Sequence, residues 1–173
     1  MSERTVKMRG TPLPLEGPEL SVGDRAPDFC LVQRGPDGLR EITWADFDGK
    51  CLILSVVPSL DTPVCERQTV RFNDEVISLP ANVEVLTVSM DLPFAQARFC
   101  SDKGTHQVQT ASDHRTAEFG KAYGVLIEPL RLLARAVFVV DADRQIRYAQ
   151  YVPEVTDQPD FEAALSVARE VAN

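Results

Sequence analysis

The stretch Cys51-Leu52-Ile53-Leu54-Ser55-Val56-Val57, continued by Pro58-Ser59-Leu60-Asp61-Thr62-Pro63-Val64-Cys65, decides the fold. A continuous apolar run such as 51–57 is typical of a strand that helices cover on both faces. After it, Asp61 or Thr62 can cap a helix, because Pro63 suits the first helical position. The apolar residues that follow recur at helical spacing, at Val64, Phe72, Val76 and Leu79. We therefore expect a buried strand followed closely by a helix that ends before the next proline.

Outward from this unit, strand and helix signals alternate along the chain. Short strands are expected at 28–32 and 39–43, a second buried strand at 83–89, helices at 93–101 and 116–122, paired strands at 132–140 and 146–151, and a last helix at 160–172. Turn residues at 10–12 predict an N-terminal β-hairpin. This order predicts an α/β protein with a thioredoxin-like fold, in which helices flank a mixed central β-sheet. The length favours a single domain over 1–173, with 1–17 as the hairpin extension.

The composition is that of a globular protein with an acidic surface. Hydrophobic residues make up 44% of the chain, charged residues 25%, and the formal net charge is −8. Because such a surface repels phosphate groups and anionic lipid, we expect neither nucleic acid nor a membrane as partner. The first residues carry no apolar signal-peptide core, so we expect a cytoplasmic protein. In that reducing compartment, the four cysteines are expected to be buried, catalytic or metal-binding rather than structural disulfides.

Cys65 is the first candidate functional residue, because it falls in the first turn of the helix after the buried strand. Ligands of open α/β sheets bind where strands end and helices begin. The free N–H groups and the positive end of the helix dipole favour a thiolate there. With Thr62 as N-cap, its hydroxyl would point toward the N–H of residue 65, while Pro58 and Pro63 would stiffen the loop over the sulfur. From position alone, a buried cysteine that packs as a small hydrophobe is an equally good interpretation.

Two motifs make the chain resemble a known family. Pro58, Thr62 and Cys65 match the Pro-x-x-x-Thr-x-x-Cys arrangement of the peroxiredoxins. The segment Ser89-Met90-Asp91-Leu92-Pro93-Phe94-Ala95-Gln96-Ala97-Arg98-Phe99-Cys100 is similar to the signature of one branch, the bacterial thiol peroxidases or atypical two-cysteine peroxiredoxins. The two motifs in this order are more specific than either alone, and the resemblance covers most of the chain.

The resemblance implies a role for each matching residue. Cys65 would be the peroxidatic cysteine, whose thiolate attacks a hydroperoxide and becomes a sulfenic acid, and Cys100 would be the resolving cysteine of the same chain. Thr62 would bind the thiolate and the peroxide, and Pro58 would shield the sulfur. Arg135 resembles the family's active-site arginine, which stabilises the thiolate and the leaving oxygen. The resemblance further implies a homodimer, thioredoxin as reductant, a preference for organic hydroperoxides, and no metal or organic cofactor.

Thiol chemistry is consistent with these roles. A cysteine peroxidase must leave the sulfenic state before a second peroxide oxidises it to sulfinic acid, and a second cysteine at a flexible helix start supplies that exit. A disulfide needs Cα atoms about 4.4–6.8 Å apart, which cysteines on two intact helices rarely meet. We therefore predict that the segment around Cys65, the segment around Cys100, or both unwind locally during turnover.

The other candidate residues favour packing or solvent exposure. Without the resemblance, Arg135 would be interpreted as a strand-end arginine that reaches water. Cys30 and Cys51 fall in apolar strands and are expected to be buried and inert. His106 and His114 lie in polar, turn-rich sequence and are expected to face solvent. Zinc is disfavoured, because no two cysteines have the short spacing of zinc ligands.

Two further functions would use the same cysteines. A redox sensor or regulatory protein would signal through the Cys65–Cys100 switch without rapid turnover. A thiol-disulfide oxidoreductase that acts on proteins is disfavoured by the wide spacing of Cys65 and Cys100, and the sequence has no Cys-x-x-Cys motif of a thioredoxin-type reductase. Sustained consumption of peroxide would distinguish a peroxidase from a sensor, which would stop near one equivalent.

Overall fold

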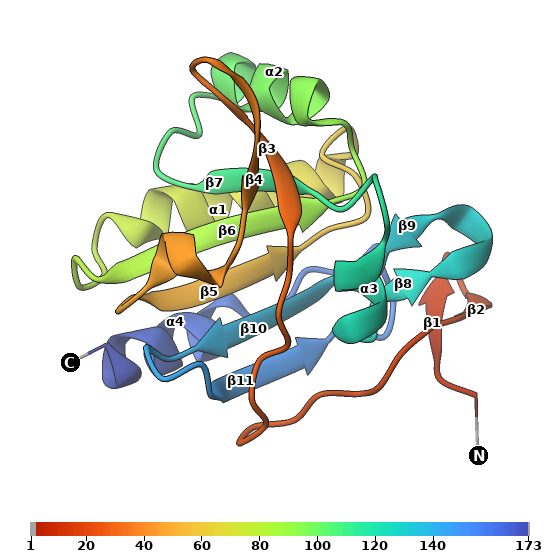
Figure 1. Cartoon of the computed structure of the whole chain (residues 1–173). Coiled ribbons are helices and arrows are strands. Elements are labelled where there is room, and N and C mark those ends of the chain that lie inside the picture. Colours follow the sequence, from red (N-terminus) through yellow and green to blue (C-terminus); the bar gives the residue numbers. More distant parts are fainter. Residues whose placement is uncertain (1–2, 173) are drawn as a thin grey trace.

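The computed structural model describes residues 3–172, so residues 1, 2 and 173 of the predicted domain lie outside the described residues. A seven-stranded mixed sheet forms its centre (Figure 1). In spatial order the strands are β11 (Ile146–Tyr151), β10 (Ala136–Val140), β5 (Cys51–Val56), β6 (Val83–Ser89), β7 (Gln109–Ser112), β3 (Leu31–Gly35) and β4 (Gly38–Ile42). β6 is parallel to both β5 and β7, whereas the remaining pairs are antiparallel. The predicted α/β class and mixed central sheet are confirmed.

The apolar run quoted above forms β5, and its two faces are buried by different helices. Leu52 and Leu54 pack in the cluster that includes side chains of α3 (Glu118–Ala122) and of the 3-10 helix η1 (Trp44–Phe47). Cys51 and Ile53 pack in the cluster of α1 (Pro63–Val76) and α4 (Phe161–Val171). Because side chains alternate along a strand, Ser55 belongs to the face that α1 covers. Within residues 3–172, no helix has the length and apolar character needed to cross a membrane.

The chain departs from the expected elements between residues 116 and 140. The expected strand over 132–140 is divided, because β9 (Leu132–Leu133) pairs with β8 (Leu126–Ile127) and β10 begins only at residue 136. The expected helix over 116–122 is shorter, because Ala117 has the left-handed φ of 57° and α3 begins after it. A second 3-10 helix, η2 (Glu128–Leu130), joins β8 to β9. The division after β9 matters for the site, since residue 135 falls within it.

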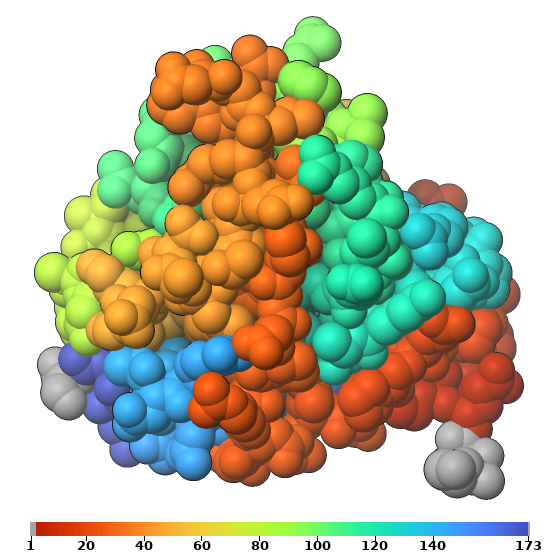
Figure 2. Space-filling view, in the orientation of Figure 1, coloured from red at the N-terminus to blue at the C-terminus, as the bar shows by residue number. Residues whose placement is uncertain are grey.

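α2 (Pro93–Lys103) lies at one end of the sheet, against β7 and β3, and the β3–β4 hairpin rises beside it (Figures 1 and 2). The Arg34 guanidinium of that hairpin lies 5.4 Å from the centre of the Phe94 ring on α2. Val32 and Ser112 form the single register pair between β3 and β7. Backbone hydrogen bonds therefore contribute little to the contact between β3 and β7, and side chains make most of it.

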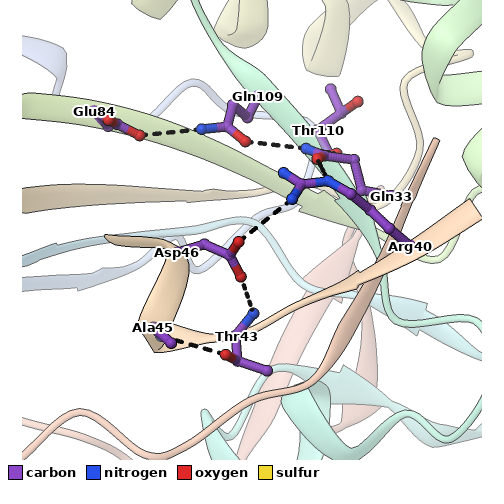
Figure 3. A network of polar contacts seen from close by, with 8 residues as sticks. All are labelled: Gln33, Arg40, Thr43, Ala45, Asp46, Glu84, Gln109 and Thr110. Atoms are coloured by element: carbon purple, nitrogen blue, oxygen red, sulfur yellow. Dashed lines mark hydrogen bonds and ion pairs between the residues drawn. The ribbon is translucent and has the colours of Figure 1, made fainter. Parts of the chain in front are cut away.

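A chain of polar side chains joins β6, β7, β3 and β4 (Figure 3). The Gln33 amide donates to Gln109 Oε1 at 3.1 Å and to the Thr110 carbonyl at 3.2 Å. It accepts a hydrogen bond from Arg40 Nε at 2.9 Å, and Gln109 donates to Glu84 on β6 at 3.0 Å. The network holds β7, and with it Thr110, in place beside α2.

The predicted N-terminal hairpin is present as β1 (Thr5–Met8) and β2 (Thr11–Pro14). It docks on the segment that follows β11. The N–H of Lys7 donates to the Pro153 carbonyl at 2.8 Å, and the N–H of Val155 donates to the Lys7 carbonyl at 2.9 Å. The hairpin therefore fixes the backbone around residue 155.

The Glu154 carboxylate ties the hairpin turn to this segment, and its effect should depend on pH. It accepts hydrogen bonds from the N–H groups of Gly10 at 3.0 Å and Arg9 at 2.9 Å. The Gly10 hydrogen bond is the largest of the effects that lower the pKa of Glu154 to about 2. Because the folded pKa is lowered, the ionised carboxylate stabilises the folded state above about pH 4.5, and this contribution is lost as the pH falls toward 2.

We expect Glu154→Gln to lower the free energy of urea-induced unfolding near neutral pH, with a difference from wild type that shrinks between about pH 4.5 and pH 2. Glu3→Gln removes an exposed carboxylate that precedes the hairpin and is the matched control. The same pH dependence in both variants would contradict the role of Glu154.

Candidate active site

Cys65 is the third residue of α1 and its side chain is fully buried, with 0% of its surface exposed. It packs in a small apolar cluster with Val57 and Leu60, and Phe99 of α2 packs against that cluster. Beside it, a cavity of about 700 Å³ opens between the loop 59–63 and α2, and its lining includes Thr62 and Phe99. The sulfur therefore lies beneath an apolar cover at the carboxyl end of β5, where the sequence predicted a site.

Arg135, from the division between β9 and β10, places a buried cation against this sulfur. Only 1% of the residue is exposed. Its Nη2 donates to Cys65 Sγ at 3.3 Å, its Nη1 to Gln68 Oε1 at 2.6 Å, and its Nε to the Val155 carbonyl at 2.9 Å. A cation buried this deeply needs such partners, and a neighbouring guanidinium favours the thiolate form of a cysteine. The interpretation of Arg135 as a strand-end arginine that reaches water is therefore wrong.

Gln68 and Ser55 complete the arrangement, and neither was predicted from the sequence. The Gln68 amide accepts from Arg135 and donates to Ser55 Oγ at 2.8 Å, and both side chains are fully buried. Two signals were available. Residues 65 and 68 are three apart, which puts them on one face of a helix. Ser55 is also the one hydroxyl within an otherwise apolar strand.

Pro58 and Thr62 lie in the loop that leads into α1. Pro58 is buried, whereas Thr62 is exposed at the N-cap position. The Thr62 hydroxyl donates to the Ser59 carbonyl at 2.9 Å and makes no capping hydrogen bond. The prediction that this hydroxyl points toward the N–H of residue 65 is wrong, because the turn over 59–62 brings a competing backbone acceptor within reach.

Cys100 lies on α2 with its side chain directed away from the Cys65 cluster. It is the eighth residue of that eleven-residue helix, so the prediction of a flexible helix start is wrong. Its Sγ contacts Thr110 Oγ1 on β7 at 3.9 Å and lines a second cavity of about 550 Å³. The preceding residue, Phe99, packs toward Cys65 instead. Successive helix residues point about 100° apart, so Phe99 can face Cys65 while Cys100 does not. Both Cys65 and Cys100 are free thiols, and they lie in different surroundings.

Cys51 and Cys30 differ from each other, and neither has an environment that favours a thiolate. Cys51 is buried, as predicted, and burial raises the pKa of its thiol to about 11. Cys30 is exposed and precedes β3, so the prediction that it is buried within a strand is wrong. Partial desolvation and, after it, the Glu41 carboxylate raise the pKa of the Cys30 thiol.

The histidines show no sign of a metal site. His106 is exposed, as predicted, whereas His114 is half-buried and its Nδ1 lies 2.9 Å from Ser112 Oγ, contrary to the prediction that it faces solvent. Among the described residues, no group of three or more His, Cys, Asp or Glu side chains could hold a metal ion.

Comparison with known proteins decides the family. The redoxin family matches residues 21–165 of the chain. Thiol peroxidases from Halalkalibacterium halodurans and Bacillus subtilis are 50% and 49% identical to it, over 95% and 98% of this chain and 97% and 98% of their own lengths. The chain belongs to the bacterial thiol peroxidases. The family that the motifs at 58–65 and 89–100 indicated is thereby confirmed.

Solved structures of peroxiredoxin-type proteins have the same fold as this thiol peroxidase family member. A peroxiredoxin-like protein from Aquifex aeolicus superposes with a TM-score of 0.88 at 43% identity, covering 97% of each chain. A thiol peroxidase from Chromobacterium violaceum superposes with a TM-score of 0.82 at 25% identity, covering 96% of this chain and 95% of its own. The predicted thioredoxin-like fold is confirmed.

The hydrogen bonds of Gln68 predict a large effect on stability. Gln68→Ala would leave Arg135 Nη1 and Ser55 Oγ buried without this partner. We expect the free energy of unfolding in urea to fall by about 2–4 kcal/mol. Gln107→Ala, which shortens an exposed glutamine, is the control and should stay within about 0.5 kcal/mol of wild type. Equal losses in the two variants would contradict the arrangement around Arg135.

Proposed function

We propose that the chain reduces hydroperoxides by means of a Cys65 sulfenic acid and an intramolecular Cys65–Cys100 disulfide that thioredoxin reduces. The observation that carries this proposal is the buried hydrogen bond from Arg135 Nη2 to Cys65 Sγ. A fixed positive charge beside the sulfur suits the negative charge that a nucleophilic sulfur carries when it attacks peroxide. Cys30 and Cys51 lack this support, since their surroundings raise the pKa of each thiol.

In the first step, the Cys65 thiolate attacks the terminal oxygen of the hydroperoxide. An S–O bond forms as the O–O bond breaks, and the leaving alkoxide takes up a proton to become an alcohol. Arg135 stabilises the negative charge that moves from sulfur to the leaving oxygen. α1 begins at Pro63, so the N–H of Cys65 has no acceptor within the helix and can donate to a peroxide oxygen. The Thr62 hydroxyl can do the same by turning from the Ser59 carbonyl, while Pro58 shields the sulfur from water.

In the second step, the Cys100 thiolate attacks the sulfenic sulfur, an S–S bond forms, and the hydroxyl group leaves as water. Cys65 is enclosed and Cys100 lies against Thr110, so α2, the start of α1, or both must unwind for the two sulfurs to meet. A dithiol reductant then reduces this disulfide to two thiols and is itself oxidised to a disulfide.

The surroundings of the site support an organic hydroperoxide as substrate. The apolar cluster around Cys65, with Phe99 of α2 packed against it, offers contacts to a hydrocarbon group. Family membership supports thioredoxin as the reductant, a homodimer and a cytoplasmic location.

Turnover with a thioredoxin system tests the proposal. We expect wild type to sustain NADPH consumption with cumene hydroperoxide, thioredoxin and thioredoxin reductase. Cys65→Ser should abolish this consumption, and Cys100→Ser should stop near one equivalent of peroxide because the sulfenic acid has no resolving thiol. Cys30→Ser, which changes an exposed cysteine, should turn over like wild type. A wild-type chain that consumes one equivalent and stops would instead support the redox sensor.

The role of Arg135 predicts the behaviour of a conservative variant. Lysine keeps the charge but cannot reach Cys65, Gln68 and Val155 at once, as the three guanidinium nitrogens do. We expect Arg135→Lys to lower the rate constant for oxidation of Cys65 by about 10²-fold in rapid-mixing measurements. Arg115→Lys, at an exposed position 3.5 Å from Glu41, is the control. Rates that differ by less than about threefold from wild type would contradict this role.

A further inference from the structure

Asp91 connects the loop before α1 to the start of α2, two segments whose present contacts must break during the proposed reaction. It lies between β6 and α2, in the segment that leads to Cys100. Its carboxylate reaches across to the loop before α1, which leads to Cys65. Oδ1 accepts from the Ser59 hydroxyl at 2.7 Å, and Oδ2 accepts from the Leu60 N–H at 2.8 Å. A single carboxylate therefore joins the cysteine-bearing elements at their N-terminal ends.

The contacts continue into α2 and the sheet. Ser89 Oγ donates to Asp91 Oδ2 at 2.7 Å. Gln96 Nε2, from the first turns of α2, donates to Ser89 Oγ at 2.9 Å and to the Ala111 carbonyl on β7 at 2.8 Å. Ser89 and Gln96 are buried, so these hydrogen bonds are protected from competition with water. The loop before α1 is thereby held to the same framework as α2.

The carboxylate does not serve α2 as a cap. Leu92 is the N-cap residue of that helix, and no side-chain hydrogen bond caps it. An aspartate just before a helix usually accepts from the first N–H groups of that helix. Here both oxygens are used by the opposite loop and by Ser89. The arrangement suits a contact between two segments better than local helix stabilisation.

We propose that Asp91 is a positioning residue that holds the loop before α1 against the start of α2, and that the release of its contacts limits the rate of disulfide formation. This inference rests on the proposed reaction of Cys65 with Cys100. While the contacts persist, the Cys65 sulfenic acid stays at its position in α1, away from Cys100. A second hydroperoxide can then transfer its terminal oxygen to the sulfur, which leaves a sulfinic acid and an alcohol. Once they are released, the segments unwind and Cys100 attacks. Asp91 thus sets the proportion of Cys65 that is resolved rather than overoxidised.

Asp91→Asn tests this role because it keeps the size of the side chain. The amide is uncharged, so the hydrogen bonds with Leu60 and Ser59 lose the strength that the carboxylate's charge gives them. In single-turnover experiments with cumene hydroperoxide, quenched by thiol alkylation and analysed by mass spectrometry, we expect disulfide formation to be about tenfold faster than in wild type, the factor that about 1.4 kcal/mol produces. The sulfinic fraction at a fixed excess of peroxide should fall by a similar factor. Formation of the sulfenic acid should not accelerate.

Asp48→Asn is the matched control, since Asp48 is an exposed aspartate that follows η1 and does not line the cavity beside Cys65. It should leave both quantities unchanged. If Asp91→Asn leaves disulfide formation within twofold of wild type, or slows it together with sulfenic acid formation, Asp91 is not the residue that limits release.

Two measurements keep the inference separate from the proposed function and from misfolding. Hydrogen exchange of the Leu60 amide in the reduced protein reports the contact directly, and we expect its protection to fall about tenfold in the Asp91→Asn variant. Unchanged protection of the Leu60 amide would overturn the inference. Failure to form the Cys65–Cys100 disulfide would contradict the proposed function alone, and the Leu60 measurement would still decide the inference. Should Asp91→Asn not fold, Ser59→Ala removes one of the two contacts between the loop and Asp91. It should change the rate of disulfide formation and the protection of the Leu60 amide in the same directions, by about threefold. No change in either measurement would overturn the inference.

Discussion

The structure depends on the burial of one cation. The Arg135 guanidinium lies almost completely out of contact with water, and a charge in that position is tolerated only when its nitrogens find acceptors. Its three acceptors come from distant parts of the chain: the sulfur and the amide from α1, and the Val155 carbonyl from the segment after β11. The N-terminal hairpin holds that segment through Lys7. The hairpin, α1 and the division between β9 and β10 are therefore parts of one arrangement around Cys65.

The same enclosure creates a conflict that the proposed reaction must resolve. Apolar cover and a guanidinium suit a reactive thiolate, but they also keep Cys65 away from the face of α2 that carries Cys100. Two stable helices are the resting arrangement, and disulfide formation requires one of them to give way. We assign Asp91 to this step, because it accepts hydrogen bonds from the loop that leads to Cys65 and precedes the helix that carries Cys100.

Sequence patterns were sufficient for the central strand, α1, the order of the main elements and the place of Cys65. Those features follow from local rules: a long apolar run, a proline in a first helical turn, and helical spacing. The rest depended on contacts that no local pattern encodes. The run 132–140 is apolar except for Arg135, so neither its division nor the burial of that arginine could be predicted from it. Thr62 had two acceptable hydrogen-bond geometries, and Gln68 was one of many polar residues on a helix until Arg135 was placed beside it.

The role of Cys65 is tested most directly by a titration of the fully reduced chain with one equivalent of hydroperoxide, followed by proteolysis without reduction and peptide mapping. We predict one cross-linked peptide pair that joins Cys65 to Cys100 within the same chain, with Cys30 and Cys51 recovered as free thiols. A cross-link that contains Cys30 or Cys51, or the loss of the peroxide with Cys65 still reduced, would contradict the assignment of Cys65 as the cysteine that attacks the hydroperoxide.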